Sequence, residues 1–296
     1  MTTDRGSPTG APRDEEMITM LDTGDASIAV TDLGGGGPPL VLLHGLAGSS
    51  REMRPTGERL RDRFRVLLVD QRGHGASTRR PGDLSREAYV ADVVQVIDEY
   101  IPGERCVLVG QSMGAHTAFL TAAARPDLVD RLVMLEGHAA DSDDEQDAAR
   151  LGRFFASWPV PFADVATARS YLGADAIVDA WIADLEVTPH GLRPRFDADV
   201  MQRTIEAVHV SRWAEWEALR VPTLAIFAKH GMFTEAEKDE LIRRRPATAR
   251  IDLSAGGHDA HLDAFDEWID TLRGALLSDV QAAPVREGPS DGPDPR

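Results

Sequence analysis

Short runs that are apolar at nearly every position recur along the 296 residues and constrain the fold more than any other feature of the sequence. They occupy residues 40–43, 66–69, 106–109, 132–135, 223–227 and 250–253. A strand that is apolar on both faces is typical of a parallel sheet covered by helices on each side. Between the runs, apolar residues recur at the helical spacings of three and four, as in the segments around Val93 and Trp268. The alternation predicts an α/β fold assembled from strand, helix and strand units.

One interval, residues 138–219, breaks this alternation because it contains no convincing parallel strand. An interval of this length is too long for a loop in a compact domain, so we predict an inserted helical cap. Four of the five tryptophans lie in it, and we expect most of its aromatic residues to form the cap's own core and some to face a pocket. Apolar periodicity predicts helices at residues 148–155, 174–185 and 199–216.

The rest of the chain divides into a core and two tails. The core consists of residues 17–137 and 220–278, and it begins with two additional strands at 17–21 and 27–31. The flanking segments are polar or rich in Pro, Gly and charge, and we predict that both are disordered, at residues 1–16 and 279–296. The first of them lacks the apolar stretch of a secretory signal, so we expect a cytoplasmic protein.

Charge and composition exclude several classes of function. The net charge of −17 repels phosphate backbones and anionic membranes, so we expect neither a nucleic acid nor a membrane as partner. No apolar run approaches the roughly 20 residues of a membrane-spanning helix. The single cysteine, Cys106, rules out an internal disulfide, and no spacing typical of metal ligands occurs. The glycine run 34–37 is followed by prolines rather than a helix, so it offers no phosphate cradle. We expect no metal and no cofactor.

The residues that carry chemistry begin with the sequence Gly-Gln-Ser-Met-Gly at 110–114, which lies between a predicted strand and a predicted helix. A serine at such a turn is forced into a tight backbone conformation that exposes its hydroxyl, and the glycines let strand and helix approach closely. The following helix N-terminus favours developing negative charge. Ser112 is therefore the candidate nucleophile.

Taken together with two further motifs, this sequence resembles the α/β-hydrolase superfamily over residues 17–277. The motifs are His-Gly-Leu-Ala-Gly at 44–48 and Asp-Gln-Arg-Gly-His-Gly at 70–75. The resemblance implies a mostly parallel eight-stranded sheet with helices on both faces and an inserted helical cap. It also implies an oxyanion hole formed by the backbone N–H groups of Leu46 and Met113. We expect His44 and His74 to hold loops through hydrogen bonds rather than to transfer protons.

The general base is predicted to be His258, which follows the last predicted strand in a loop that begins with two glycines. This placement fits the family order of nucleophile, acid and histidine. His261 is the alternative, although a second histidine of this kind more often packs or lines a pocket.

The acid departs from the commonest pattern of the family. Gly231 stands where most relatives have an aspartate after the seventh strand, and a minority of the family places the acid after the sixth strand, where this chain has Glu136. A carboxylate at the end of an apolar strand needs a partner, and His258 is the obvious one. The alternatives are that Glu136 pairs with an arginine such as Arg131, or that Glu235 or Asp239 is the acid.

The predicted reaction is hydrolysis of a small hydrophobic carboxylic ester or lactone through a Ser-His-Glu triad and an acyl-enzyme. A C–C bond hydrolase or thioesterase would use the same residues, and a non-catalytic ligand receptor of the same fold is a further alternative that Gly231 favours. We expect an apolar pocket between cap and sheet. Its candidate side chains are Met113, Phe154, Trp158, Trp181, Met232 and Phe233.

Overall fold

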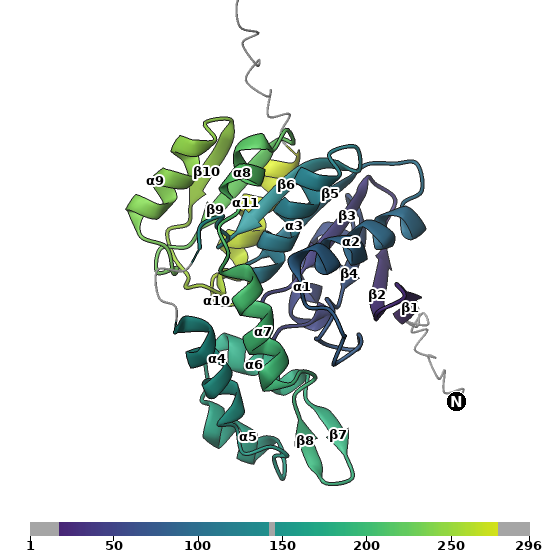
Figure 1. Ribbon diagram of the computed structural model, residues 1–296, viewed down its shortest axis with the longest axis vertical. Helices are drawn as coiled ribbons and strands as arrows, with labels where there is room; N and C mark the ends of the chain where they lie inside the picture. Colours follow the sequence, from purple (N-terminus) through teal and green to yellow (C-terminus); the bar gives the residue numbers. More distant parts are fainter. Residues whose placement is uncertain (1–17, 142–145, 278–296) are drawn as a thin grey trace, which may run out of the picture.

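The computed structural model describes residues 18–141 and 146–277, and both predicted tails lie outside this part of the chain. An eight-stranded sheet forms the centre, with the strand order β1-β2-β4-β3-β5-β6-β9-β10 (Figure 1). β1 and β2 run antiparallel to their neighbours and the other strands are parallel, as predicted. The strands are β1 (Ile18–Asp22), β2 (Ser27–Gly34), β3 (Pro39–Leu43), β4 (Arg65–Val69), β5 (Cys106–Gln111), β6 (Val129–Leu135), β9 (Thr223–Phe227) and β10 (Thr248–Asp252).

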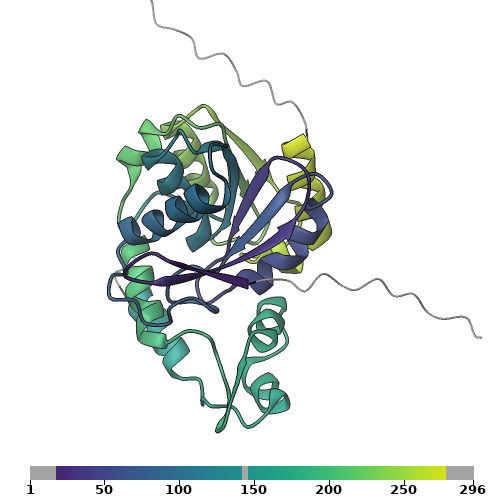
Figure 2. The same ribbon diagram turned by 90° about the vertical axis from the view of Figure 1, so that its right-hand side faces the viewer.

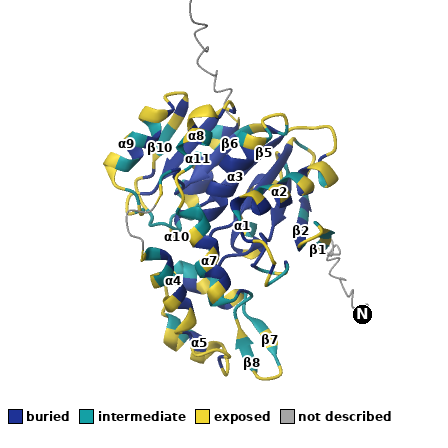
Figure 3. Cartoon of the chain, in the orientation of Figure 1, coloured by how far each residue is buried: buried dark blue, intermediate teal, exposed yellow. Residues whose placement is uncertain are grey.

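Helices cover both faces of the sheet, because successive strand residues point to opposite sides. In β3, Val41 and Leu43 pack in one apolar cluster while Leu40 and Leu42 pack in the other. Figure 3 shows the central strands buried between these layers. The first cluster includes residues of α2 (Arg86–Tyr100), α3 (Met113–Ala124), α8 (Trp213–Ala218) and α9 (Glu235–Arg244), and the second includes residues of α1 (Ser50–Leu60), α10 (Ala260–Asp263) and α11 (Phe265–Leu277).

Residues 146–208, between β6 and β9, form a cap at one end of the sheet (Figures 1 and 2). Its aromatic residues pack against one another in a third apolar cluster that includes Phe155, Trp158 and Phe162. The cap also contains a short antiparallel hairpin that the sequence did not predict, because its two strands have three residues each and little apolar character. The cap elements are α4 (Asp147–Ala156), α5 (Val165–Leu172), α6 (Ala176–Ala183), β7 (Glu186–Thr188), β8 (Gly191–Arg193) and α7 (Ala198–Val208).

The predicted helix over residues 199–216 is instead two helices, α7 in the cap and α8 on the core. Trp216 on α8 is fully buried in the first core cluster, where its indole N–H donates to Leu241 O at 2.9 Å. The expectation that the insertion's tryptophans form the cap's own core is therefore wrong for Trp216. Periodicity alone does not reveal which apolar surface a helix covers.

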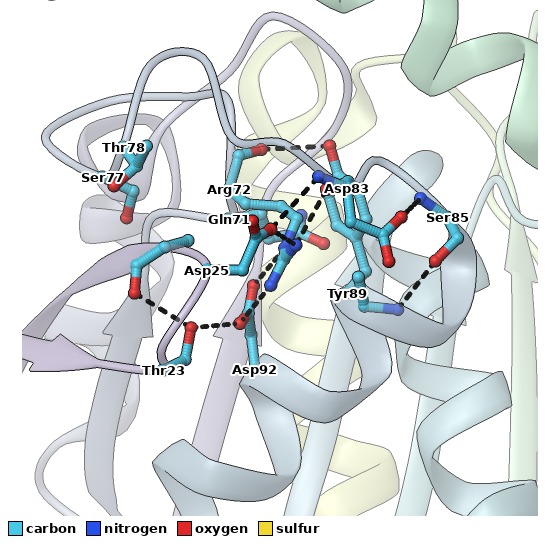
Figure 4. Close-up of polar contacts among 12 residues, drawn as sticks. Thr23, Asp25, Gln71, Arg72, Ser77, Thr78, Asp83, Ser85, Tyr89 and Asp92 are labelled. Atoms are coloured by element: carbon cyan, nitrogen blue, oxygen red, sulfur yellow. Dashed lines mark hydrogen bonds and ion pairs between the residues drawn. The ribbon is translucent and has the colours of Figure 1, made fainter.

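A buried ionic network fixes the turn that follows β4 (Figure 4). The Arg72 guanidinium, 3% exposed, donates to both oxygens of Asp92 at 2.6 and 2.7 Å. It also donates to Asp25 at 2.9 Å and to Asp83 O at 2.8 Å. A bidentate pair of this kind orients both partners. The preceding residue, Gln71, is thereby positioned beneath the candidate active site, where its side chain donates to His44 O at 2.6 Å.

Within the described residues, no helix has the length and apolar character needed to cross a bilayer. The same part of the chain contains no cluster of three or more His, Cys, Asp or Glu side chains arranged to hold a metal ion.

Candidate active site

Ser112 occupies a sharp turn between the end of β5 and the start of α3. Its φ of 52° lies in the left-handed region that non-glycine residues rarely adopt, which confirms the predicted tight conformation. Its backbone N–H donates to Leu135 O on β6 at 2.9 Å. A Cβ at Gly110 would overlap the backbone of Gly114, and a Cβ at Gly114 would overlap that of Leu43. Both glycines are thus required for the close approach of strand and helix.

His258 and Glu136 come together from loops that are 122 residues apart in sequence. His258 Nδ1 lies 3.5 Å from Glu136 Oε2. Glu136 is buried, and its carboxylate also accepts hydrogen bonds from the backbone N–H groups of Ala228 at 2.8 Å and Met232 at 2.9 Å. These donors compensate for the loss of water around the charge. In the tautomer that carries its proton on Nδ1, this contact directs the N–H toward the carboxylate and leaves Nε2 able to accept a proton.

The other candidate acids lie elsewhere. Glu235 and Asp239 are exposed on α9, where both bind Arg250, at 2.6 and 2.9 Å. Arg131, the alternative partner of Glu136, donates instead to Ala275 O at 2.7 Å. Of the carboxylates that the sequence proposed, only Glu136 contacts His258.

Gln111 is a site residue that the sequence analysis missed. Its side-chain N–H group donates to His258 O at 3.0 Å and to Asp259 Oδ1 at 3.4 Å, so it ties the nucleophile turn to the histidine loop. Burial raises the pKa of Asp259. A Cβ at Gly45 would overlap the Gln111 amide. The serine motif allows any residue at the position of Gln111, so the motif itself carries no signal for it.

The predicted oxyanion-hole donors flank the nucleophile. Met113 is the first residue of α3, so its N–H has no partner within the helix. Among the described residues, neither the Leu46 N–H nor the Met113 N–H donates a hydrogen bond to another group. Leu46 and Ser112 line the same cavity. Two unused backbone donors beside a serine hydroxyl can stabilise a developing oxyanion.

The remaining histidines of the motifs hold loops, as predicted. His44 Nδ1–H donates to Gly45 O at 2.7 Å, and His44 Nε2 accepts from the Gln71 N–H at 3.0 Å. His74 Nδ1 bonds Arg72 O at 2.9 Å, and burial lowers the pKa of His74 to about 3. His261, the alternative base, is buried, and its Nε2 lies 3.7 Å from Glu52 Oε1. It does not line the cavity that contains Ser112 and His258.

A cavity of about 400 Å³ lies between the cap and the carboxyl ends of the strands. We call it the apolar cavity; Leu46, Ser112, Phe154, Phe155, Trp181 and His258 are among its lining residues. Of the predicted pocket side chains, Phe154, Trp181 and Met232 line it, whereas Met113 and Phe233 line an adjoining cavity. Trp158 lines neither cavity, so its prediction as a pocket residue is wrong. It is buried among Phe155, Phe162 and Phe196 in the cap, where neighbouring aromatic rings stabilise it.

Comparisons with known proteins show which proteins this chain is similar to. The sequence model of the alpha/beta hydrolase fold family matches residues 38–171. A 2-(acetamidomethylene)succinate hydrolase from Mesorhizobium japonicum is 28% identical over 220 residues, which are 72% of this chain and 78% of that protein. The sn-1-specific diacylglycerol lipase ABHD11 of Mus musculus is 43% identical over 103 residues, only 33% of this chain and 32% of the lipase.

The solved structures show the same fold. The crystal structure of E-2-(acetamidomethylene)succinate hydrolase superposes with a TM-score of 0.78 at 23% identity, covering 89% of this chain and all of the other. Sequence and fold agree with the expectation drawn from the three motifs. The chain therefore has the α/β-hydrolase fold, and the sequence of residues 38–171 matches the model of that fold family.

Proposed function

We propose that this protein is a serine hydrolase that cleaves a carboxylic ester or lactone through a triad of Ser112, His258 and Glu136. One observation carries the proposal: Ser112 and His258 line one cavity, and the His258 imidazole has a buried carboxylate behind it at 3.5 Å. A nucleophile, a base and a group that orients the base are the parts that acyl transfer requires.

In the proposed reaction, Ser112 Oγ attacks the carbonyl carbon while His258 Nε2 takes the serine proton. The Leu46 and Met113 N–H groups stabilise the tetrahedral oxyanion. As the intermediate collapses, the bond to the leaving oxygen breaks and that oxygen takes the proton from His258. Water then attacks the acyl-enzyme by the same route, which releases the acid and restores the serine. Glu136 stabilises the imidazolium that forms in each step.

The aromatic lining of the apolar cavity supports a substrate with a substantial hydrophobic part. The partial match to a diacylglycerol lipase supports ester chemistry. The similarity to a 2-(acetamidomethylene)succinate hydrolase over most of the chain favours a second candidate, hydrolysis of a bond other than an ester by the same triad. A ligand receptor without catalysis is the weaker proposal, because a receptor has no need of a buried carboxylate behind His258.

The test combines labelling with turnover. A fluorophosphonate should modify Ser112 in the folded protein, because only an activated serine reacts quickly with this reagent; the modified residue is identified by mass mapping. A panel of p-nitrophenyl esters, lactones and acyl thioesters then ranks the bond types by kcat/KM. Ser112→Ala should abolish labelling and turnover, while Ser157→Ala, at an exposed serine of the cap, should change neither. Labelling at another residue, or none, would favour the receptor.

A further inference from the structure

Arg86, the first residue of α2, is a buried cation for which the proposed mechanism has no role. The residue is 1% exposed. Only one of its three side-chain nitrogens has a hydrogen-bond partner among the described residues: Nη2 donates to Thr117 Oγ1, whereas Nε and Nη1 have none. No carboxylate in that part of the chain forms an ion pair with it. The guanidinium carbon lies 4.3 Å from the centroid of the Tyr89 ring, which attracts the charge.

The charge of Arg86 is costly where it lies. Burial lowers the pKa of Arg86 to about 10, so the guanidinium remains protonated at neutral pH. A buried charge without a carboxylate partner costs free energy that contact with one aromatic ring offsets only in part. Arg245, 7% exposed, is better satisfied, because all three of its nitrogens donate, to Leu219 O at 2.9 Å, Thr248 Oγ1 at 2.8 Å and Val221 O at 2.7 Å. Stability alone therefore does not account for a charged residue at position 86.

Thr117, which accepts the hydrogen bond of Arg86, connects the guanidinium to both sides of the candidate oxyanion hole. Its hydroxyl oxygen lies 2.7 Å from Gln71 Oε1 and 3.0 Å from Met113 O, one turn earlier on α3. Gln71 Nε2 donates in turn to His44 O at 2.6 Å. Met113 is one candidate oxyanion donor, and His44 begins the loop that carries the other, Leu46. The cation is thus two hydrogen bonds from one donor residue and three from the loop of the other.

The cation sets the direction of these hydrogen bonds. A guanidinium can only donate, so the Thr117 hydroxyl accepts from Arg86 and directs its own proton to Gln71 Oε1 or Met113 O. With its oxygen turned to Thr117, the Gln71 amide presents its N–H group to His44 O. Each hydrogen bond of such a chain polarises the next one, and a buried chain is little screened by water. The chain therefore carries the positive charge of Arg86 toward the place where negative charge develops.

The electrostatic effect of Arg86 extends to the first turn of α3. Burial, and secondly the charge of Arg86, lower the pKa of His116, whose backbone N–H donates to Ser112 O at 3.0 Å. Arg86 lines neither the apolar cavity nor the adjoining one, so it acts through other residues rather than by touching the substrate.

We propose that Arg86 is a positioning residue of the oxyanion hole, whose charge, relayed by Thr117, stabilises the negative oxygen of the tetrahedral intermediate. The inference rests on the proposed function, in which that oxygen forms at Ser112. Because the oxygen gains its charge only as the bond to Ser112 forms, Arg86 should affect kcat and leave KM almost unchanged.

Two buried arginines, replaced one at a time, test the inference by opposite effects. Arg86→Met should lower kcat for one good p-nitrophenyl ester about tenfold, with KM changed less than about twofold; loss of a direct oxyanion donor costs about 10²-fold or more. Its melting temperature should equal or exceed that of the wild type, because a buried charge without an ion-pair partner is removed. Arg245→Met should lower the melting temperature and keep the wild-type kcat, since Arg245 binds the residues that begin β9 and β10, at the ends of these strands away from the site.

Arg86→Lys, which keeps a charge and a donor, should retain more of kcat than Arg86→Met. An unchanged kcat in Arg86→Met would overturn the inference. Loss of folding or a clear fall in the melting temperature of Arg86→Met would overturn it too, because Arg86 would then be structural.

Binding of hexyl trifluoromethyl ketone separates this inference from the proposed ester chemistry. The ketone adds to an activated serine and forms a tetrahedral oxyanion without turnover, and fluorine NMR detects the adduct. Its Kd should be about tenfold higher for Arg86→Met than for the wild type, and Ser112→Ala should form no adduct. If esters are hydrolysed but both proteins bind the ketone equally, the inference alone is wrong. If no ester is hydrolysed but the tenfold difference is present, only the ester chemistry fails. If the wild type neither hydrolyses an ester nor forms the adduct, both proposals are wrong.

Discussion

The Glu136 carboxylate fills the space that a side chain at Gly231 would occupy. A Cβ built at Gly231 would overlap both carboxylate oxygens. Glu136 reaches this place from the end of β6, with a left-handed φ of 51°, and it bonds the backbone on either side of Gly231 through Ala228 and Met232. A glutamate at position 136, after β6, and any side chain at position 231, after β9, would therefore compete for the same space in this protein.

Replacing Glu136 by Gln should lower kcat by about 10²-fold or more. The variant keeps the size of the side chain but removes the charge that stabilises the imidazolium, a loss that costs about 10⁴-fold in serine proteases. Turnover of one good ester is the measurement, with thermal melting to confirm folding. Glu235→Gln and Asp239→Asn are the matched controls and should keep near wild-type rates. Collapse of either control, with Glu136→Gln fully active, would place the acid after the seventh strand.

Gly231→Ala should damage activity although residue 231 takes no part in the chemistry. Its added methyl group would displace the Glu136 carboxylate from His258 and from its two backbone donors. Activity and melting temperature should both fall. The double variant Glu136→Ala/Gly231→Asp moves the carboxylate to the commoner position of the family, so it should be more active than Glu136→Ala alone. Wild-type activity of Gly231→Ala would show that the two sites do not compete for space.

Arg72→Ala should destabilise the fold by about 3–5 kcal/mol, because it leaves the Asp92 carboxylate, 4% exposed, buried without its partner. Arg72→Lys should recover only part of this loss, since an ammonium group cannot reproduce the bidentate geometry. Denaturant unfolding monitored by fluorescence measures the difference. Arg125→Ala, which removes an exposed pair with Asp127, is the control and should change little. Equal effects of the two variants would contradict the structural role of the network.

His74 should make the protein less stable in acid. Burial, and secondly the neighbouring His44, lower the pKa of His74 from 6.5 to about 3. Below pH 6.5 the unfolded chain binds a proton that the folded protein excludes, so the stability that this group confers is complete above that pH and is lost toward pH 3. Between pH 6.5 and 5 the free energy of unfolding should fall by about 2 kcal/mol through this residue alone.

The comparison of wild type with His74→Gln isolates this contribution from that of other buried histidines. Unfolding free energies are measured by denaturant titration at pH 7, 6 and 5. The wild type should lose more stability than His74→Gln over this range, whereas the exposed His190→Gln should follow the wild type. Identical pH dependence in all three proteins would mean that His74 titrates normally in the fold.

Local signals explain what could be predicted of the site. The turn at Ser112 is predicted by the glycines two residues away on either side. Glu136 is predicted to be a site residue because it is a charged residue at the end of an apolar strand. The positions of Trp216 and Gln111 could not be predicted because each depends on a partner far along the chain. Trp216 packs on α3 and α9, and Gln111 holds a loop 147 residues away.

The sequence by itself determined the parallel sheet and the nucleophile turn, because backbone geometry and apolar periodicity are properties of neighbouring residues. The order of the candidate triad was predicted from the resemblance of the motifs to the α/β-hydrolase superfamily. Only the tertiary structure decided that Glu136, rather than Glu235 or Asp239, reaches His258, and that Ser112 and His258 line one cavity. The physical reason is that a carboxylate becomes an orienting group through distances and burial that no neighbouring residue sets.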